Sequence, residues 1–262
     1  MLRVDGVDVF VEGTGTETVL MVHGWPDTHR LWDSTVAALG ARRRCVRFTL
    51  PGFDAAHPRR MYTVDDLVAF LQAVADRVSP DRPLTLLAHD WGCILGYEFA
   101  MRHPARVARI VGVDIGDPGS LRRSMRPRAK CYVLGYQVWL AAAWKIGGRT
   151  GDAMTRSMAR RARRPAHDGL VASRMNYLYF LSWFGGAQAV RHHVQRSSPR
   201  VPMLFAYGRR KPFPFHSPQW LDELRSSPAN HVEPFDTGHW VMLEEPGRFN
   251  AVVEAWLDAT PA

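Results

Sequence analysis

The sequence has few cysteines and no long apolar run. Its three cysteines, Cys45, Cys93 and Cys131, stand singly in apolar stretches without metal-ligand spacing. This excludes a disulfide scaffold or zinc ribbon and predicts small core residues in a reducing compartment. The most apolar later stretch, 132–144, is shorter than the roughly 20 residues of a membrane span, so a buried helix is predicted there. The first residues lack the apolar core and cleavage site of a secretory leader, which favours a cytoplasmic location.

Acidic residues are outnumbered, with 25 Asp and Glu against 34 Lys and Arg, for a formal net charge of +9. Much of the excess is arginine in two clusters, at 122–128 and 156–164. Basic clusters can bind nucleic acid or an anionic membrane, but charge determines association rather than fold. A solvated helical face is the favoured interpretation, with no nucleic-acid partner and no membrane span. A homodimer is left open.

A chain of 262 residues suits one large α/β domain or a core with an insertion. Residues 1–15 indicate two short strands around a turn. Further strand-like runs are uniformly apolar, as expected for strands covered on both faces. They lie at 18–24, 45–52, 84–90, 109–114, 203–208 and 231–235. Helical patterns separate them, the clearest following Thr63 as N-cap and reaching Val78. This alternation predicts a mostly parallel, doubly wound α/β sheet.

The alternation stops between residues 116 and 199, a stretch rich in Arg, Met, Trp and Tyr without a convincing strand. A helical cap inserted between two core strands is the simplest explanation. It is expected over the carboxyl ends of the strands, where open α/β sheets bind ligands. The predicted organisation is therefore a core made of 1–115 and 200–262, with a cap at 116–199.

The stretch "LTLLAHDWG" (84–92) places a carboxylate, Asp90, at the tip of a buried strand. An unpaired charge there is costly unless it is compensated. In a nucleophile elbow, a strand leads into a sharp turn that carries the nucleophile, and a helix follows. Small residues stand two positions before and two positions after the nucleophile, and Ala88 and Gly92 occupy those positions here. A carboxylate can act as a covalent nucleophile, and the N–H groups of the new helix would stabilise it. The alternative is that Asp90 is only a helix N-cap.

Two further motifs favour catalysis. The loop "HGWPD" follows an early strand, where hydrolases with this elbow place one oxyanion-hole donor, and the residue after the nucleophile supplies the other. Those donors are the backbone N–H groups of Trp25 and Trp91. Near the C-terminus, "FDTGHW" sets His239 in a glycine-containing loop. A general base is expected there, because the triad order is nucleophile, acid, histidine.

Together, HGWP, HDWG and the late GHW resemble the α/β-hydrolase-fold epoxide hydrolases, with the haloalkane dehalogenases as close relatives. The resemblance extends over nearly the whole chain. It implies a cofactor-free enzyme that opens an apolar epoxide to a vicinal diol through an alkyl ester on Asp90. Water activated by His239 would hydrolyse the ester.

The acid of the triad departs from the commonest family pattern. Many relatives carry an Asp after the strand equivalent to 203–208, but this chain has Lys211 there. Dehalogenase-type relatives take the acid from the end of the strand that follows the nucleophile helix, which implies Asp114 as the partner of His239. Asp117 and Asp236 are rivals that more readily cap turns.

The family also implies two cap tyrosines that donate a proton to the opened epoxide. The second corresponds to Tyr177 or Tyr179, and the first to Tyr136 or to the position held by Trp139. Dehalogenases instead hold a halide with N–H donors, and the Trp25-Pro26 pair favours the epoxide branch. The alternatives are a haloalkane dehalogenase, another α/β hydrolase with an Asp nucleophile, or a non-catalytic ligand receptor of this fold.

Overall fold

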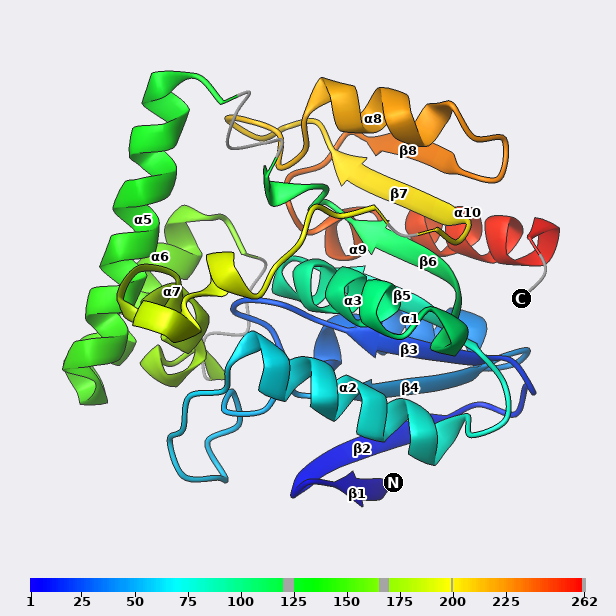
Figure 1. Cartoon of the computed structure of the whole chain (residues 1–262), viewed down its shortest axis with the longest axis horizontal. Coiled ribbons are helices and arrows are strands. Elements are labelled where there is room, and N and C mark those ends of the chain that lie inside the picture. The colour runs from blue at the N-terminus through cyan, green and yellow to red at the C-terminus, as the bar shows by residue number, and fades with distance from the viewer. Residues whose placement is uncertain (120–124, 165–169, 199, 261–262) are drawn as a thin grey trace.

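One mixed β-sheet forms the centre of the computed structural model, which describes residues 1–119, 125–164, 170–198 and 200–260. Among these residues, eight strands are arranged in the order β1-β2-β4-β3-β5-β6-β7-β8 (Figure 1). Their bounds are β1 Leu2–Val4, β2 Val7–Glu12, β3 Thr18–Val22, β4 Arg44–Phe48, β5 Leu84–His89, β6 Val107–Val113, β7 Met203–Gly208 and β8 His231–Phe235. The β1–β2 and β2–β4 pairs are antiparallel, and the five pairs from β4–β3 to β7–β8 are parallel, which confirms the predicted, mostly parallel sheet.

The parallel register brings four strand ends to one edge of the sheet. Val22 pairs with Ala88, and Ala88 pairs with Gly112 on the other side. Val113 pairs with Ala206. The chain segments that leave β3, β5, β6 and β7 therefore emerge side by side, which is the place where an open parallel sheet binds ligands.

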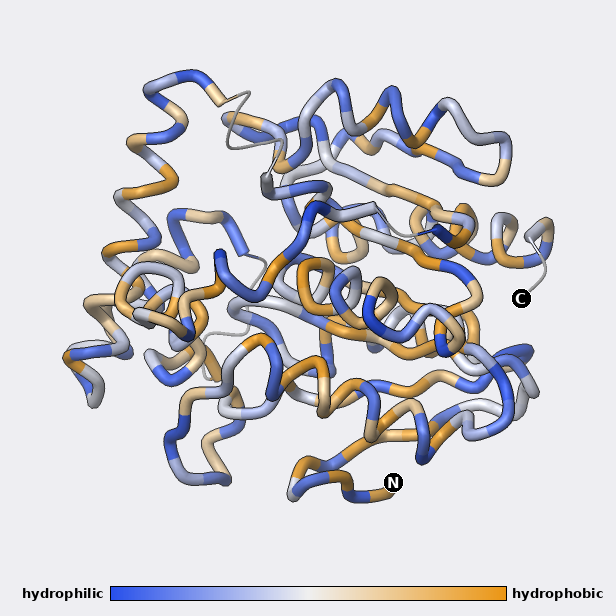
Figure 2. The backbone as a smooth tube through the Cα atoms, viewed as in Figure 1, coloured by the Kyte–Doolittle hydropathy of each residue, from blue (hydrophilic) through white to orange (hydrophobic). Residues whose placement is uncertain are grey.

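Helices cover both faces of the sheet, as the continuous apolar strands require. Helices α2 (Val64–Val78), α3 (Trp91–Arg102) and α8 (Pro218–Arg225) contribute to one buried apolar cluster. The other face is covered by α1 (Asp33–Leu39), α9 (Val241–Glu244) and α10 (Pro246–Ala259), with the short 3-10 turn η1 (His29–Trp32). A second 3-10 turn, η2 (Pro104–Arg106), lies between α3 and β6 in the chain. Figure 2 shows hydrophobic residues concentrated along the central strands.

The predicted start of α2 is confirmed in detail. The Thr63 side chain accepts a hydrogen bond from the Asp66 N–H, and the Asp66 carboxylate accepts one from the Thr63 N–H. This reciprocal capping box satisfies two backbone donors that a helix otherwise leaves unpaired.

The described residues between 116 and 198 form helices and no strand. They comprise α5 (Pro127–Ile146), α6 (Gly148–Arg161), η4 (Ser173–Asn176), α7 (Tyr177–Phe184), η5 (Gly186–Gln188) and η6 (Val190–His192). Figure 1 shows α5, α6 and α7 grouped beside the carboxyl ends of the parallel strands. None of the helices in the described ranges is long and apolar enough to cross a membrane. Arg122 and Arg123 lie outside the described residues.

Two burial predictions are wrong. The stretch 132–144 is helical as expected, but within it only Leu140, Ala141, Ala143 and Trp144 of α5 are buried. The first half of α5 is largely exposed, and Cys131 is exposed while Cys45 and Cys93 are buried. An apolar sequence leads to burial only where another element covers it, and α6 and α7 pack against one side of α5.

Candidate active site

Asp90 sits at a sharp turn between β5 and α3. Its φ of 54° and ψ of −125° lie where residues other than glycine are uncommon. The turn requires close packing, because a Cβ on Gly92 would lie 2.2 Å from the Val22 carbonyl oxygen. A Cβ on Gly24 would lie 2.4 Å from Asp90 Oδ1 and from the Trp91 nitrogen. Glycines at both positions thus let the HGWP loop touch the Asp90 turn directly.

The two oxygens of Asp90 have different surroundings. Oδ1 accepts a hydrogen bond of 2.7 Å from the Trp25 N–H, and the adjacent Trp91 N–H lowers the pKa of this carboxylate. Oδ2 faces His239, with 3.4 Å to Nε2. The side chain makes no capping hydrogen bond to α3, so the simple N-cap interpretation does not hold. One oxygen is held by a backbone donor, and the other faces His239.

His23, which sequence reasoning did not single out, holds the HGWP loop in place. Its Nε2 accepts a 2.9 Å hydrogen bond from the Leu50 N–H, so the ring proton is on Nδ1, 2.9 Å from the Gly24 carbonyl oxygen. Burial lowers the pKa of His23 to about 3, so the ring is neutral. This fixed tautomer orients the backbone that carries the Trp25 N–H.

Asp114 lies directly after β6 and is fully buried beside His239. Its Oδ2 pairs with His239 Nδ1. Its Oδ1 accepts hydrogen bonds from the Gly208 N–H at 3.0 Å and from Lys211 Nζ. The two rivals are elsewhere: Asp117 accepts from two backbone N–H groups in its own surroundings, and Asp236 is exposed.

The charges in this cluster shift all three pKa values. Burial raises the pKa of Asp114, but the charges of Lys211 and His239 outweigh it and hold the carboxyl well below its usual range. Burial also raises the pKa of Asp90, and hydrogen bonding to His239 reverses this. For His239, burial lowers the pKa, while Asp114 and then Asp90 raise it to about 9. At neutral pH the imidazole is therefore protonated between two carboxylates.

His89, the last residue of β5, contacts His239. Its Nε2 donates to the His239 carbonyl oxygen at 3.1 Å, and the two rings lie 4.4 Å apart. Burial lowers the pKa of His89 to about 3, which makes it a neutral donor. The backbone of the histidine loop is thereby tied to the end of β5.

Lys211 stands where the usual family acid is expected, and its side chain is only 6% exposed. Burial lowers its pKa, and Asp114 partly restores it. A buried cation needs a partner to remain charged. The cation also limits how strongly Asp114 can hold a proton on His239.

This arrangement predicts the effect of Lys211→Met. Without the cation, the full charge of Asp114 acts on His239, so the pKa of His239 should rise above about 9. The pH midpoint of any step that needs neutral His239 should then move upward by about one unit. Rates measured between pH 6 and 10 test this, with the exposed neighbour Arg210→Met as control. An unchanged midpoint in Lys211→Met would contradict the electrostatic role.

The three candidate tyrosines separate into two groups. The Tyr179 ring lies edge-on to Trp25 at 5.8 Å and to Trp91 at 5.4 Å. Tyr136 of α5 lies 6.1 Å from Tyr179. Burial, and then the charge of Asp90 among other groups, raises the pKa of both phenols, so they are neutral proton donors near this carboxylate.

Tyr177 belongs elsewhere. Its hydroxyl donates to the Pro51 carbonyl oxygen at 2.8 Å, and its ring packs against Phe53 and Trp144. Of the two alternatives at this motif, the geometry favours Tyr179, because residues two positions apart on one helix face about 200° apart. Trp139 is excluded as well, because it is exposed and its indole N–H donates to the Met154 carbonyl oxygen.

Contacts from the helical segment 116–199 reach the HGWPD loop. The Trp25 indole N–H donates to Asn176 Oδ1 at 2.7 Å. Buried Asp27 pairs with Arg164 at 2.9 Å and accepts from the Trp240 indole at 2.9 Å. No local sequence signal pointed to these long-range pairs. They join this segment to the HGWPD loop, and Asp27 of that loop in turn bonds Trp240 beside His239.

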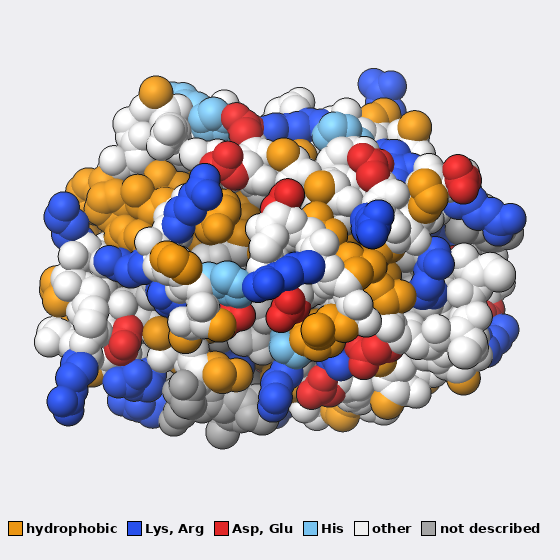
Figure 3. All heavy atoms as spheres, turned by 90° about the horizontal axis from the view of Figure 1, so that it is seen from below, with side chains coloured by type: hydrophobic (Ala, Val, Ile, Leu, Met, Phe, Trp, Pro, Cys, Tyr) orange, Lys and Arg blue, Asp and Glu red, His pale blue; other side chains and the backbone are white. Residues whose placement is uncertain are grey.

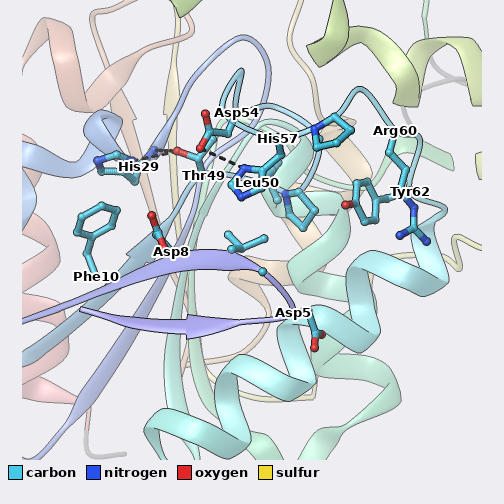
Figure 4. A pocket seen from close by; sticks show the side chains of 15 residues that line it. Asp5, Asp8, Phe10, His29, Thr49, Leu50, Asp54, His57, Arg60 and Tyr62 are labelled. Atoms are coloured by element: carbon cyan, nitrogen blue, oxygen red, sulfur yellow. Dashed lines mark hydrogen bonds and ion pairs between the residues drawn. The ribbon is translucent and has the colours of Figure 1, made fainter.

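A separate surface pocket of about 270 Å³ lies between the β1–β2 hairpin and the loop 49–62 (Figure 4). Its lining includes Asp8, His29, His57 and Tyr62, and neither Asp90 nor His239 contributes to it. His29 there bonds Thr49 at 2.9 Å. The described residues contain no group of three His, Cys, Asp or Glu side chains arranged to hold a metal ion.

The profile of the alpha/beta hydrolase family matches residues 19–252. The chain belongs to the alpha/beta hydrolase family. Its overall architecture agrees with an epoxide hydrolase from Bacillus megaterium solved with an inhibitor, at a TM-score of 0.75 and 20% identity, covering 98% of this chain and 99% of that one. That level of identity supports the fold.

Curated relatives of this hydrolase match over shorter stretches. The "Probable oxidoreductase EphD" of Mycobacterium tuberculosis is 35% identical over 47% of this chain and 24% of its own length. "Epoxide hydrolase B" of the same organism is 31% identical over 42% of this chain and 34% of its own length. A "Cis-3-alkyl-4-alkyloxetan-2-one decarboxylase" of Xanthomonas campestris is 36% identical over 36% of this chain and 35% of its own. The matched parts thus amount to about a quarter to a third of these relatives.

Proposed function

We propose that this hydrolase opens apolar epoxides to vicinal diols, with Asp90 as nucleophile, His239 as base and Asp114 as its acid. The observation that carries the proposal is the Asp90 carboxylate, with one oxygen on the Trp25 N–H, the other toward His239, and two phenols close by. The helical segment 116–199 serves as the cap that supplies those phenols.

In the first step, Asp90 Oδ2 attacks an epoxide carbon, and the bond from that carbon to the ring oxygen breaks. The leaving oxygen takes a proton from Tyr179, assisted by Tyr136. Asp90 becomes a neutral alkyl ester whose carbonyl oxygen, Oδ1, already lies at the Trp25 donor. Covalent catalysis divides one difficult reaction into two easier ones.

In the second step, water attacks the ester carbon and gives its proton to His239. Ester formation has removed one of the two carboxylates that raise the pKa of His239. That pKa therefore falls, and the imidazole can act as a base near neutral pH. The negative charge that develops on Oδ1 is stabilised by the Trp25 and Trp91 N–H groups. On collapse, the bond from the ester carbon to the alkyl oxygen breaks, and that oxygen takes the proton from His239, which releases the diol. The carboxylic acid left on Asp90 gives its proton back to the Tyr179 phenolate.

The indole groups favour epoxide opening over halide release. A halide site needs free N–H donors beside the nucleophile, but the Trp25 indole N–H is bonded to Asn176. The phenols of Tyr136 and Tyr179 instead suit an alkoxide, which needs a proton. This contrast supports the epoxide assignment over the haloalkane dehalogenase.

The test is a substrate panel given to the purified chain: styrene oxide, a long-chain epoxide, a haloalkane and a disubstituted oxetan-2-one. We expect diol from an epoxide, with loss of turnover in Asp90→Ala. Halide release or decarboxylation without diol formation would replace the proposal with the corresponding activity. Ligand binding without any turnover would indicate a receptor.

The tyrosine roles lead to a separate prediction. Tyr179→Phe and Tyr136→Phe should each slow formation of the Asp90 ester on the order of a hundredfold, because a donor to the developing alkoxide is lost. Hydrolysis of the ester should be nearly unchanged. Tyr177→Phe is the matched control: it loses a structural hydrogen bond worth about 1 kcal/mol of stability but should alkylate normally. Stopped-flow tryptophan fluorescence separates the two steps, and equal rates in all variants would contradict the assignment.

A further inference from the structure

The outward side of α5 is apolar where an ordinary surface helix is polar. Leu134 is 44% exposed and Val138 39%, and these two residues lie one helical turn apart. Tyr132, Trp139 and Ile146 recur every seven residues along the adjoining flank and are also exposed. Between Cys131 and Trp144 the helix carries no charged residue. The solvent side of α5 is therefore a continuous apolar strip.

The end of α7 extends this strip. Trp183 is 44% exposed and Phe184 60%, and the Trp183 indole N–H donates to Gln137 of α5 at 3.1 Å. The Trp139 indole N–H is also bonded within the protein. Because both N–H groups have partners, the exposed parts of the rings offer apolar surface. Hydrophobic side chains gather on this end of the molecule, with Lys and Arg beside them (Figure 3). We name these exposed side chains of α5 and α7 the apolar face.

The segment that carries the apolar face has a large excess of positive charge. Residues 116–199 contain 15 Lys and Arg against 3 Asp and Glu, a formal charge of +12. The rest of the chain has 19 against 22, or −3. No acidic residue occurs from Pro118 to Gly151. Exposed basic side chains flank α5 at its start and just beyond its end: Arg126, Arg128, Lys130, Lys145 and Arg149.

We infer that the apolar face and its basic border dock on an anionic lipid bilayer. Exposed Trp, Tyr and Leu side chains enter the interface between headgroups and acyl chains, while Lys and Arg attract anionic headgroups. A second copy of the chain would bring two segments of charge +12 together. Nucleic acid would use the basic residues but not the exposed aliphatic side chains. A bilayer with anionic lipids uses both.

The apolar face also adjoins the residues of the candidate active site. Ring contacts lead from His239 to Phe215 at 5.3 Å and on to Phe213 at 5.2 Å. Phe213 meets the half-exposed Tyr132 at 5.8 Å, and Tyr132 meets Tyr136 at 5.9 Å. Docking through α5 would place this series of ring contacts against the membrane, where apolar molecules concentrate. The docking itself does not depend on which reaction the site performs.

Cys131 provides a direct probe, because it is the exposed cysteine on α5 while Cys45 and Cys93 are buried. An environment-sensitive dye attached to Cys131 should shift to the blue and brighten with vesicles containing about one third phosphatidylglycerol. Pure phosphatidylcholine vesicles should have much less effect. The response should weaken as salt rises, because charge attraction is screened.

Co-sedimentation of the unlabelled full chain with the same vesicles is used to compare matched variants. Leu134→Gln with Val138→Gln should weaken binding tenfold or more, whereas Met61→Gln, an exposed apolar residue of the core, should not. The triple change of Arg126, Arg128 and Lys130 to Gln should weaken it about a hundredfold. The same change at Arg77, Arg82 and Arg225, which are exposed on the core, should have little effect.

Four results would overturn the inference. Absence of binding to anionic vesicles would do so directly, as would equal loss in the core controls. Self-association that the Leu134 and Val138 changes abolish, without vesicle binding, would assign the face to a second copy. Binding to duplex DNA that is insensitive to those two changes, again without vesicle binding, would assign the basic residues to nucleic acid. Diol formation from soluble epoxides is measured separately, so failure of docking and failure of the proposed activity are distinguishable.

Discussion

His239→Gln protein mixed with excess epoxide is expected to gain the mass of one substrate molecule on Asp90 and to stop there. Attack by Asp90 does not need the imidazole as a base, but hydrolysis of the ester does. Steady-state turnover should fall on the order of a thousandfold or more, within the range lost with a general base. Intact-protein mass spectrometry and peptide mapping would locate the adduct.

Two controls make this result specific. Asp90→Asn combined with His239→Gln should gain no mass, because its amide is a poor nucleophile. His89→Gln should keep measurable turnover, because His89 contacts only the backbone and ring of His239. If His239→Gln stays unmodified under saturating epoxide, His239 is not confined to the hydrolytic step.

Asp114→Asn is expected to keep the fold but to lower turnover on the order of ten-thousandfold. The imidazolium loses its buried counter-charge, and the amide can hold the wrong tautomer of His239. The pKa of His239 should fall from about 9, since Asp114 contributes most to raising it. NMR titration of the imidazole would measure this fall alongside the rate.

The substitution also removes the partner of Lys211, so a doubly changed protein is needed to separate the effects. Asp114→Asn with Lys211→Met leaves no buried unpaired cation, which should restore stability but not turnover. Asp236→Asn is the matched acid control and should be nearly as active as the unchanged protein, because Asp236 is exposed. If Asp236→Asn lost more turnover than Asp114→Asn, the acid of the triad would be Asp236 and not Asp114.

Much of the fold could be predicted because its signals are local. Uniformly apolar runs indicated the strands, and Thr63 with the apolar spacing that follows it indicated α2. The sharp turn at Asp90 was indicated by the small residue Gly92, although the backbone that approaches Gly92 belongs to the distant Val22. The motif order indicated Asp90 and His239, the family resemblance implied Asp114, and the geometry brings these three side chains together.

The tyrosine assignment depended on tertiary structure. Tyr177 and Tyr179 are two residues apart in one sequence motif, and nothing local says which one faces the nucleophile. Packing of α7 turns Tyr179 toward Trp25 and Trp91 and turns Tyr177 toward Pro51. A helix rotates about 100° per residue, so its docking angle determines the side chain that is presented.

The sequence by itself determined the fold class, the elbow and the candidate nucleophile and histidine, because these follow from short motifs and local periodicity. The family resemblance implied Asp114 as the acid and left Asp117 and Asp236 as rivals. Tertiary structure alone decided which residues compensate the buried charges and which apolar residues stay exposed. Lys211 pairs with Asp114 from 97 positions away, and Arg164 reaches Asp27 across 137. The exposure of α5 likewise depends on what packs against it. Such contacts arise only when distant segments meet, and no local pattern encodes that meeting.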